Sequence, residues 1–217
     1  MKLRRSLHLL GSNMYVQYGC GWNAPQDWRN FDASPTLYFE RMPLVGKLYT
    51  KNKTRFPHNV EFGDIVEGLP ISDGSCKGVY CSHVLEHLPL DDFRKALRNT
   101  WRILEVGGLF RLVLPDLEFA IQRYVSTKSP EAAINFIRET GLGRESRNRY
   151  LKGFVFEWFG NSNHLWGWDY KSIEVELANV GFSNIRRAKF RDAENPAFAA
   201  VESRERWDNC LGVECKK

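Results

Sequence analysis

The chain has 217 residues, of which 43% are apolar and 26% are charged. That size and balance fit one globular domain with a single core and exclude a fibrous or wholly disordered protein. No segment approaches the roughly 20 apolar residues of a membrane span, and the mean hydropathy is −0.43, so we expect a soluble protein. The net charge of +5 favours anionic partners such as nucleotides, nucleic acid or acidic lipid.

The five cysteines indicate a reducing compartment. Their number is odd, and they show neither the density of a disulfide framework nor paired C-x-x-C spacing. A cytoplasmic location is therefore expected. At the N-terminus, His8 and Gly11 cut the apolar stretch below the length of a signal peptide, so the chain is expected to lead directly into its first strand.

The first half of the chain predicts short strands separated by turns. Residues 36–57 show no clean periodicity and are expected to form an irregular basic segment with one helical turn. Only six residues, 22–27, separate the first two strands. The predicted strands are Met14–Tyr18, Trp28–Phe31, Gly78–Ser82 and Leu109–Leu114.

The clearest helix is predicted over Asp91–Leu104, where apolar residues recur on one face and Asp91 or Asp92 can cap the first turn. Further helices are expected from Pro130 and over Tyr170–Val180, the latter between an Asp169 cap and a Gly181 stop. Two last strands are expected near Asn184–Phe190 and Cys210–Lys216. This alternation of strands and helices predicts an α/β sheet with a terminal hairpin.

A glycine turn and an acidic residue form the first candidate site. Gly19-Cys20-Gly21 ends the first strand, and Asp32 ends the second. Glycines let a ligand approach the backbone closely, and a carboxylate at the next strand end can accept both hydroxyls of a ribose. The same G-x-G pattern also ends strands for purely conformational reasons, so both interpretations stay open here.

From Met14 to Glu118 the sequence resembles the class I S-adenosylmethionine-dependent methyltransferases, especially the compact branch that contains ubiquinone-biosynthesis-type enzymes and predicted polysaccharide methyltransferases. The resemblance rests on five segments in that family's order. They are Gly19–Gly21, Asn30–Ser34, Gly63–Ser75, Val79–Leu88 and Trp101–Gly108.

The resemblance implies a Rossmann-like three-layer sandwich with a mostly parallel sheet and an antiparallel terminal hairpin. It also implies one domain over residues 1–217. Residues 14–118 would form the cofactor-binding half, and 119–217 the helical insertion, the acceptor side and the terminal strands.

The resemblance further implies S-adenosylmethionine as cofactor and a role for each matching residue. Asp32 would bind the ribose hydroxyls, Asp64 would face the adenine amino group, and Ile65 would pack near the ring. Gly19 and Gly21 would pass close to the methionine and ribose portion of the cofactor, with Cys20 between them as a further cofactor-binding residue. Ser82 and His83 would border the methionine end and the transferring methyl.

Methyl transfer requires alignment of donor and acceptor and, where needed, removal of a proton. The candidate catalytic residues are His83, His87, Asp116 and His164. Histidine suits a base because its pKa lies near neutrality, although each of the four can instead serve as a cap or turn former. The expected acceptor is an oxygen or nitrogen of a small polar molecule, with a sugar or glycan precursor first.

Two segments carry alternatives of their own. Phe156–Tyr170 is rich in aromatic residues and could line an acceptor pocket or form a satellite core.

The second segment is the short connection between the first two strands. The family normally has a full helix between its first two motifs, for which residues 22–27 leave no room. Trp22 or Trp28 would then cover the gap, or the chain would be a non-catalytic relative that keeps only the fold.

Two other enzyme classes compete with this interpretation. His83-Val-Leu-Glu-His87 spells H-x-x-E-H, the motif of inverted zinc peptidases, which would make the protein a hydrolase. It directly follows a strand and is cut off by Pro89, so we expect no metal.

An RNA methyltransferase is suggested by the basic residues Lys47, Lys51, Lys53 and Arg55. No RNA-binding module is recognisable, so nucleic acid is not favoured as a partner.

Overall fold

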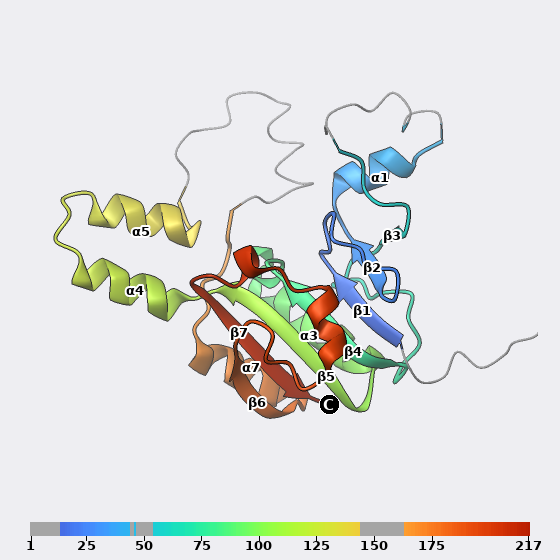
Figure 1. Ribbon diagram of the computed structural model, residues 1–217. Helices are drawn as coiled ribbons and strands as arrows, with labels where there is room; N and C mark the ends of the chain where they lie inside the picture. Colours follow the sequence, from blue (N-terminus) through green and yellow to red (C-terminus); the bar gives the residue numbers. More distant parts are fainter. Residues whose placement is uncertain (1–13, 44–45, 47–53, 144–162) are drawn as a thin grey trace, which may run out of the picture.

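The computed structural model describes residues 14–43, 46, 54–143 and 163–217. In this part of the chain the strands form one seven-stranded sheet of order β3-β2-β1-β4-β5-β7-β6 (Figure 1). β1 to β5 run parallel, while β7 is antiparallel to both β5 and β6. The strands are β1 Met14–Tyr18, β2 Arg29–Asp32, β3 Val60–Phe62, β4 Cys76–Ser82, β5 Leu104–Pro115, β6 Ser183–Ala188 and β7 Cys210–Lys216.

The helices connect these strands and confirm the predicted α/β class with its terminal antiparallel pair. Short 3-10 turns η1 Leu85–His87, η2 Pro196–Ala200 and η3 Arg204–Arg206 complete the described elements. The α-helices are α1 Pro35–Arg41, α3 Leu90–Ile103, α4 Leu117–Ser126, α5 Ala132–Thr140 and α7 Tyr170–Val180. None of the helices in the described ranges is both long and apolar enough to cross a membrane.

Helices α3 and α7 cover one face of the sheet. Alternate residues of β5, namely Phe110, Leu112 and Leu114, point to this face and pack in one core with the buried stripe of α3 and with Ile173 and Leu177 of α7. The predicted capping of α3 by Asp91 or Asp92 is wrong. The helix begins earlier, after Pro89, and both carboxylates lie in its first turn, where they favour the positive end of the helix dipole.

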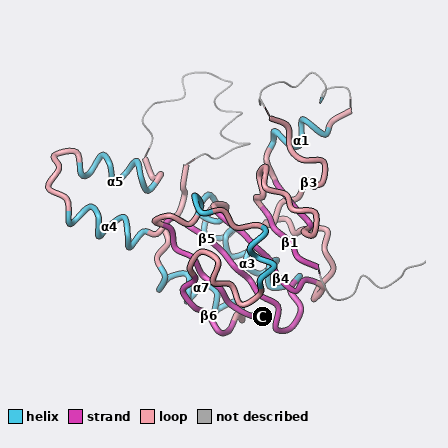
Figure 2. The backbone as a smooth tube through the Cα atoms, in the orientation of Figure 1, coloured by secondary structure: helices cyan, strands magenta, loops and turns pink. Residues whose placement is uncertain are grey.

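The opposite face is covered by residues 189–209, here called the β6–β7 segment, which includes η2 and η3 (Figure 2). Phe198 of η2 contacts the rings of Tyr15 and Trp28 edge-on, at centroid distances of 6.4 and 5.4 Å. Gly78 of β4 permits this contact, because a Cβ there would lie 2.9 Å from Phe198.

No helix lies between β1 and β2, where residues 19–28 form turns and irregular backbone. A right-handed crossover from β1 to β2 would run opposite to the one from β4 to β5 and would place its helix on the face away from α3. The β6–β7 segment packs on that same face, against Tyr15, Trp28 and Tyr80. It therefore fills the layer that the absent helix leaves open.

Arg111 is the buried polar centre of this face. Its side chain is fully buried on β5 and donates to Glu202 Oε1 at 2.6 Å, Asp192 Oδ1 at 3.0 Å and Glu214 Oε2 at 3.1 Å. Its guanidinium also stacks on Trp207, 4.5 Å from the ring centroid. Three of these four partners belong to the β6–β7 segment, so one buried cation holds that segment on the sheet.

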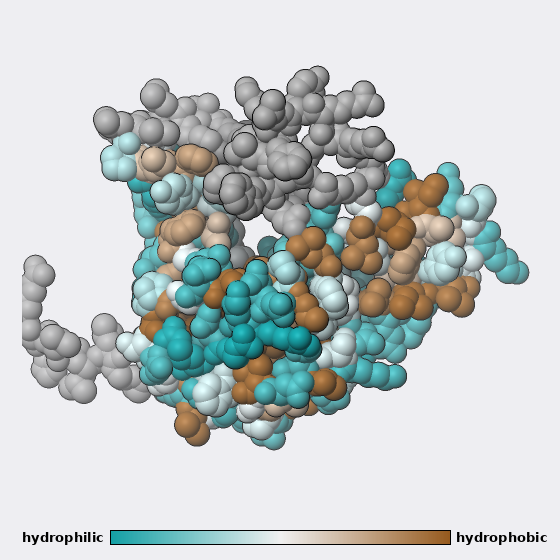
Figure 3. Space-filling view, turned by 180° about the vertical axis from the view of Figure 1, so that it is seen from behind, coloured by the Kyte–Doolittle hydropathy of each residue, from teal (hydrophilic) through white to brown (hydrophobic). Residues whose placement is uncertain are grey.

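Helix α4 was not predicted from the sequence, and the helix expected from Pro130 begins instead at Ala132. The pair α4 and α5 projects from the sheet (Figure 1), and Tyr124 packs on Phe136 within it at a centroid distance of 5.5 Å. Figure 3 shows apolar side chains gathered on this projection. None of the side chains of α4 is fully buried.

Replacing Arg111 by Met is expected to destabilise the protein by about 3–5 kcal/mol, because it leaves Glu202 and Glu214 buried without their cation. Arg29→Met is the matched control, since its pair with Glu61 is 37% and 45% exposed and should contribute about 1 kcal/mol or less. Urea unfolding of both variants measures the difference. Losses of similar size would show that Arg111 does not organise this face.

Candidate active site

The glycine turn after β1 adopts a conformation that favours glycine at two positions. Gly19 and Gly21 have φ values of +66° and +55°, in the left-handed region. A Cβ on Gly19 would collide with the Val84 side chain, whereas a Cβ on Gly21 would meet nothing within 4 Å. Gly19 is thus packed against the exit of β4, and Gly21 borders open space that a ligand can enter.

Asp32 ends β2 beside this turn and holds it in place. Its Oδ2 accepts the Gly21 N–H at 2.9 Å, and its Oδ1 accepts the Ser34 N–H at 2.8 Å. A carboxylate offers about four acceptor positions, so two remain for further donors. Cys20, between the glycines, packs with Leu37 and other apolar residues, and burial together with Asp32 raises the pKa of its thiol to about 12. Its thiol is therefore neutral at neutral pH.

Asp64 and Ile65 lie in the turn that follows β3. Asp64 Oδ1 accepts the Val66 N–H at 2.8 Å, and Ile65 is buried in the main core. Asn99 of α3 donates to the carbonyls of Ile65 and Val66, at 2.8 and 3.0 Å. The turn is fixed by α3 at the same sheet edge as Gly19 and Asp32, where open parallel sheets bind their ligands.

Ser82 and His83 form the end of β4, where Arg206 from the β6–β7 segment meets them. Arg206 donates through Nε to Ser82 Oγ at 2.9 Å, and through Nη2 to the Ser82 carbonyl. His83 donates through Nε2 to the Arg206 carbonyl at 2.9 Å and through Nδ1 to Glu86 Oε1 at 3.2 Å.

The His83 imidazole is held in its charged form. Burial alone would lower its pKa, but hydrogen bonds with Cys210, Glu86 and the Arg206 carbonyl outweigh this and raise the pKa of His83 to about 10. Both ring nitrogens face acceptors, as expected of an imidazolium. At neutral pH the ring is thus a hydrogen-bond donor.

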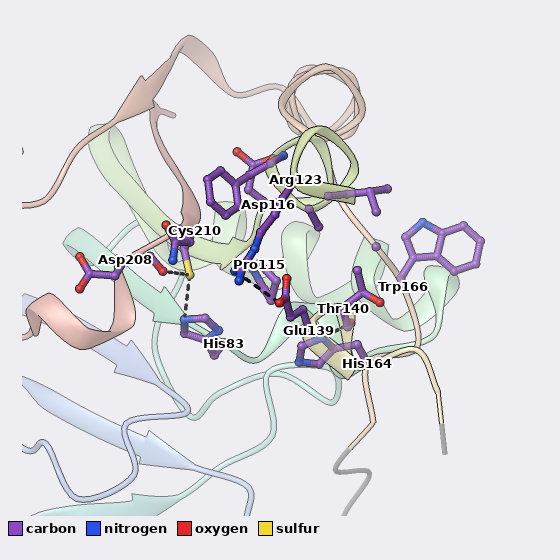
Figure 4. Close-up of a pocket in the computed structure, with 15 residues that line it drawn as sticks. His83, Pro115, Asp116, Arg123, Glu139, Thr140, His164, Trp166, Asp208 and Cys210 are labelled. Atoms are coloured by element: carbon purple, nitrogen blue, oxygen red, sulfur yellow. Dashed lines mark hydrogen bonds and ion pairs between the residues drawn. The ribbon is translucent and has the colours of Figure 1, made fainter. Parts of the chain in front are cut away.

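A cavity of about 330 Å³ opens at the carboxyl ends of β4 and β5 (Figure 4). Three candidate catalytic residues, His83, Asp116 and His164, line it. So do, among others, Phe119 and Arg123 of α4, Glu139 and Thr140 of α5, Trp166, and Asp208, Asn209 and Cys210 of the chain entering β7. The wall is mixed, with aromatic surface and both signs of charge, which suits an acceptor that is polar on its edges.

Asp116 caps helix α4 and pairs with an arginine at this wall of the cavity. Its Oδ1 accepts the Glu118 and Phe119 N–H groups at 2.9 and 3.3 Å as the cap of α4, and its Oδ2 lies 3.5 Å from Arg187 Nη1. Across the cavity mouth, Arg123 Nη1 and Glu139 Oε1 are 3.3 Å apart. This pair ties α4 to α5.

His87 and His164 come together although they are far apart in the sequence. Their ring centroids are 4.9 Å apart, and both rings approach the buried Glu86 carboxylate. His87 lies on η1, behind the cavity wall, while His164 borders the cavity itself.

The tryptophans proposed to cover the abbreviated cofactor turn have different positions. Trp22 lies beside the turn, stacked on Phe56 at 4.9 Å, and its side chain is half exposed. Trp28 is buried under Phe198 on the sheet face.

Of the four basic residues that suggested RNA binding, Arg55 is described, and it donates to the Gly46 carbonyl at 2.9 Å. Residues 1–13, Lys47, Lys51, Lys53 and the 156–162 part of the aromatic segment lie outside the described residues.

Several residues at this edge were not predicted from the sequence. Arg123 and Glu139 lie on α4 and α5, and a signal existed for α4, since Asp116 precedes Leu117, Ala120, Ile121 and Tyr124 at helical spacing. Arg206 lies on an irregular segment without periodicity, and Cys210 begins the predicted last strand but was not predicted to reach this edge. Only the three-dimensional contacts reveal them.

Comparison with known proteins finds a methyltransferase domain in the first half of the chain. Residues 18–112 match the family model described as a methyltransferase domain, and a comparison with curated protein sequences finds no match. This match and the sheet order above support the resemblance to the class I S-adenosylmethionine-dependent methyltransferases that the five sequence segments indicated.

Solved structures with the same fold are distant in sequence. A methyltransferase of Methanosarcina mazei has a TM-score of 0.52 at 15% identity, with 96% of this chain and 94% of that chain covered. One of Thermotoga maritima, described as a possible histamine N-methyltransferase, has a TM-score of 0.50 at 16% identity, with 96% and 84% covered. PigF with S-adenosylhomocysteine has a TM-score of 0.50 at 15% identity, with 94% and 50% covered.

Gly19→Ala is expected to destabilise the protein more than Gly107→Ala. Both glycines have positive φ, so alanine costs about 1–2 kcal/mol of backbone strain at either position. A Cβ on Gly107 meets nothing, whereas one on Gly19 collides with Val84 and should add about 1–3 kcal/mol of overpacking. Thermal and urea unfolding compare the two. Equal losses would mean that the turn can move away from β4.

Proposed function

We propose that this protein transfers a methyl group from S-adenosylmethionine to an oxygen or nitrogen of a small polar acceptor, with sugars and glycan precursors as the first class to test. The relative position of the glycine turn and the cavity is the main support for this proposal. The glycine turn and Asp32 lie at the ends of β1 and β2, the cavity lies at the ends of β4 and β5, and His83 stands between them. Residues 14–118 would hold the cofactor and 119–217 most of the acceptor side.

The residues at the first two strand ends fit the cofactor. Gly21 borders open space, so the backbone can be approached there without displacing a side chain. Asp32 keeps two acceptor positions for the ribose hydroxyls. Asp64 and Ile65, held by Asn99, would take the adenine end, and Ser82 and His83 would border the methionine end.

When bound, S-adenosylmethionine supplies an electrophilic methyl carbon. The acceptor atom forms a bond to it as the carbon–sulfur bond breaks, and an acceptor O–H or N–H proton is lost. The chain must therefore hold both molecules in line and exclude water. His83 and the aromatic groups Phe119 and Trp166 would orient the acceptor, whose ring faces pack on aromatic surface. His164 presents a ring nitrogen at the cavity for the proton.

Arg206 would replace a feature that the absent helix normally provides. A helix following the glycine turn would direct its N-terminus at the cofactor carboxylate, and no such helix exists here. The Arg206 side chain lies at the end of β4 and close enough to Cys20 to act on its thiol electrostatically. A guanidinium at this place can bind a carboxylate through charge-assisted hydrogen bonds.

Asp32→Asn is expected to weaken S-adenosylmethionine binding roughly 10- to 150-fold, which corresponds to about 1.5–3 kcal/mol for a hydrogen bond to a charged group. Asp27→Asn is the control, because it removes the same charge from an exposed position in the same loop. Calorimetric titration of both variants and the wild type measures the affinities. Equal affinities, or no binding by the wild type at millimolar cofactor, would refute the assigned site.

Arg206→Gln is expected to weaken binding of S-adenosylhomocysteine at least about tenfold, because it removes a charged partner of the carboxylate. An analogue of this ligand without the carboxylate should bind wild type and variant equally well. Arg204→Gln, on the same turn but exposed, serves as control. If the variant loses affinity for both ligands to the same extent, Arg206 does not recognise the carboxylate.

A further inference from the structure

Glu86, His87 and His164 direct their side chains at a common point beside the cavity. One ligand atom from each lies within 4.8 Å of the other two. The Nε2 atoms of His87 and His164 are each 4.0 Å from Glu86 Oε1. Glu86 and His87 come from η1, directly after β4, and His164 comes from the segment before α7.

The backbone sets which ring nitrogens carry protons. His87 Nδ1 donates to the Asn163 carbonyl at 3.1 Å, and His164 Nδ1 donates to the Thr140 carbonyl at 2.7 Å. In the neutral ring this leaves Nε2 as an acceptor, pointing toward a carboxylate oxygen that is also an acceptor. At 4.0 Å no hydrogen bond joins them. Two ring nitrogens and one carboxylate oxygen thus converge, and neither histidine donates to the carboxylate, an arrangement that a cation stabilises.

One oxygen of the buried Glu86 carboxylate is unsatisfied among the described residues. The residue is 1% exposed, and its Oε2 makes no hydrogen bond within the described ranges. A buried carboxylate is costly unless it is paired or coordinates a metal. His83 donates to the other oxygen, Oε1, and leaves Oε2 unsatisfied.

The three side chains are held in place without any ligand. Leu165 and Trp166 both donate backbone N–H groups to the Glu86 carbonyl, at 2.8 and 3.1 Å. His164 donates its own N–H to the Gly141 carbonyl, at 3.1 Å, where α5 ends. Hydrogen bonds from ring Nδ1 to backbone carbonyls are the usual outer support of histidines that bind metals.

We propose that Glu86, His87 and His164 bind one divalent transition-metal ion, with Zn²⁺ as the best-matched probe. Two imidazoles and one carboxylate form a donor set that suits zinc, and catalytic zinc sites use three protein ligands with one position left open. Ligand atoms on a tetrahedral zinc ion lie roughly 3.3 Å apart, so small side-chain rotations close the present gaps.

The site has a use in the proposed reaction. His164 borders the cavity, so an ion held by this cluster would be able to bind an acceptor oxygen and favour loss of its proton. His164 Nε2 would then be a metal ligand, and the ion would replace it as the group that promotes proton loss. This role rests on the proposed methyl transfer, whereas metal binding itself does not.

The site differs from the zinc-peptidase interpretation of H-x-x-E-H and from the expectation of no metal. That motif pairs His83 with His87 on one helix and uses the glutamate to activate water. Here His83 has a φ of +53° at the end of β4 and points its Nε2 at the Arg206 carbonyl. His164 takes its place, and Glu86 becomes a ligand.

The test is metal binding by the full chain, first stripped with a chelator. We expect the wild type to bind one equivalent of Zn²⁺ in calorimetry and to retain it after gel filtration, measured by elemental mass spectrometry. His164→Ala, His87→Ala and Glu86→Gln should each weaken Zn²⁺ binding by at least about tenfold. His58→Ala is the matched control, since this histidine is exposed and outside the cluster.

Two further measurements separate ligation from loss of fold. Co²⁺ bound by the wild type should show visible absorption bands, and His164→Cys should keep the ion and add a thiolate-to-metal charge-transfer band. Absence of Zn²⁺ binding by the wild type at millimolar metal, or unchanged binding by all three cluster variants, would overturn the proposal. Titration of the same samples with S-adenosylmethionine tests the proposed function separately. Zn²⁺ binding without S-adenosylmethionine binding would refute the proposed function but not the metal site.

Discussion

The buried guanidinium of Arg111 is the constraint on which the candidate active site depends. A cation in the interior must be surrounded by acceptors, because an unpaired buried charge costs several kcal/mol. Glu214 comes from the neighbouring strand β7, but Asp192, Glu202 and the stacked Trp207 come from the β6–β7 segment. The segment is therefore fixed to the sheet even though it has little regular structure. Its far end delivers Arg206 and Cys210 to the end of β4.

This arrangement explains how the sheet tolerates the loss of a helix. The helix normally found after the glycine turn would cover one sheet face and direct its N-terminus at the cofactor. In this chain Phe198 and Trp207 cover the face, and Arg206 brings positive charge to the sheet edge. The β6–β7 segment covers the face and would, in the proposed function, also supply the positive charge for the cofactor carboxylate, so the abbreviated turn between β1 and β2 is compatible with a complete site.

The sequence predicted elements with strong local signals and missed those that depend on distant contacts. β1, β7 and α7 were predicted with their observed bounds, and the capping box of Asp169 with Ser172 and the left-handed Gly181 confirm the signals used for α7. α4 has an apolar stripe at Leu117, Ala120, Ile121 and Tyr124 that the sequence prediction overlooked, and none of its side chains is fully buried. Neither the docking of Arg206 on Ser82 nor the approach of His164 to Glu86 leaves any periodicity in the sequence, since each joins residues from separate segments.

The glycine turn and the histidine cluster are linked by a direct packing contact. Gly19 packs directly on Val84, the residue that precedes η1, and η1 carries Glu86 and His87. A side chain at Gly19 would therefore push on the same backbone that positions the cluster. The turn that would hold the cofactor and the wall that would hold the acceptor share this one contact, and close packing transmits any displacement between them. In the proposed function, the exit of β4 would therefore set the spacing of donor and acceptor.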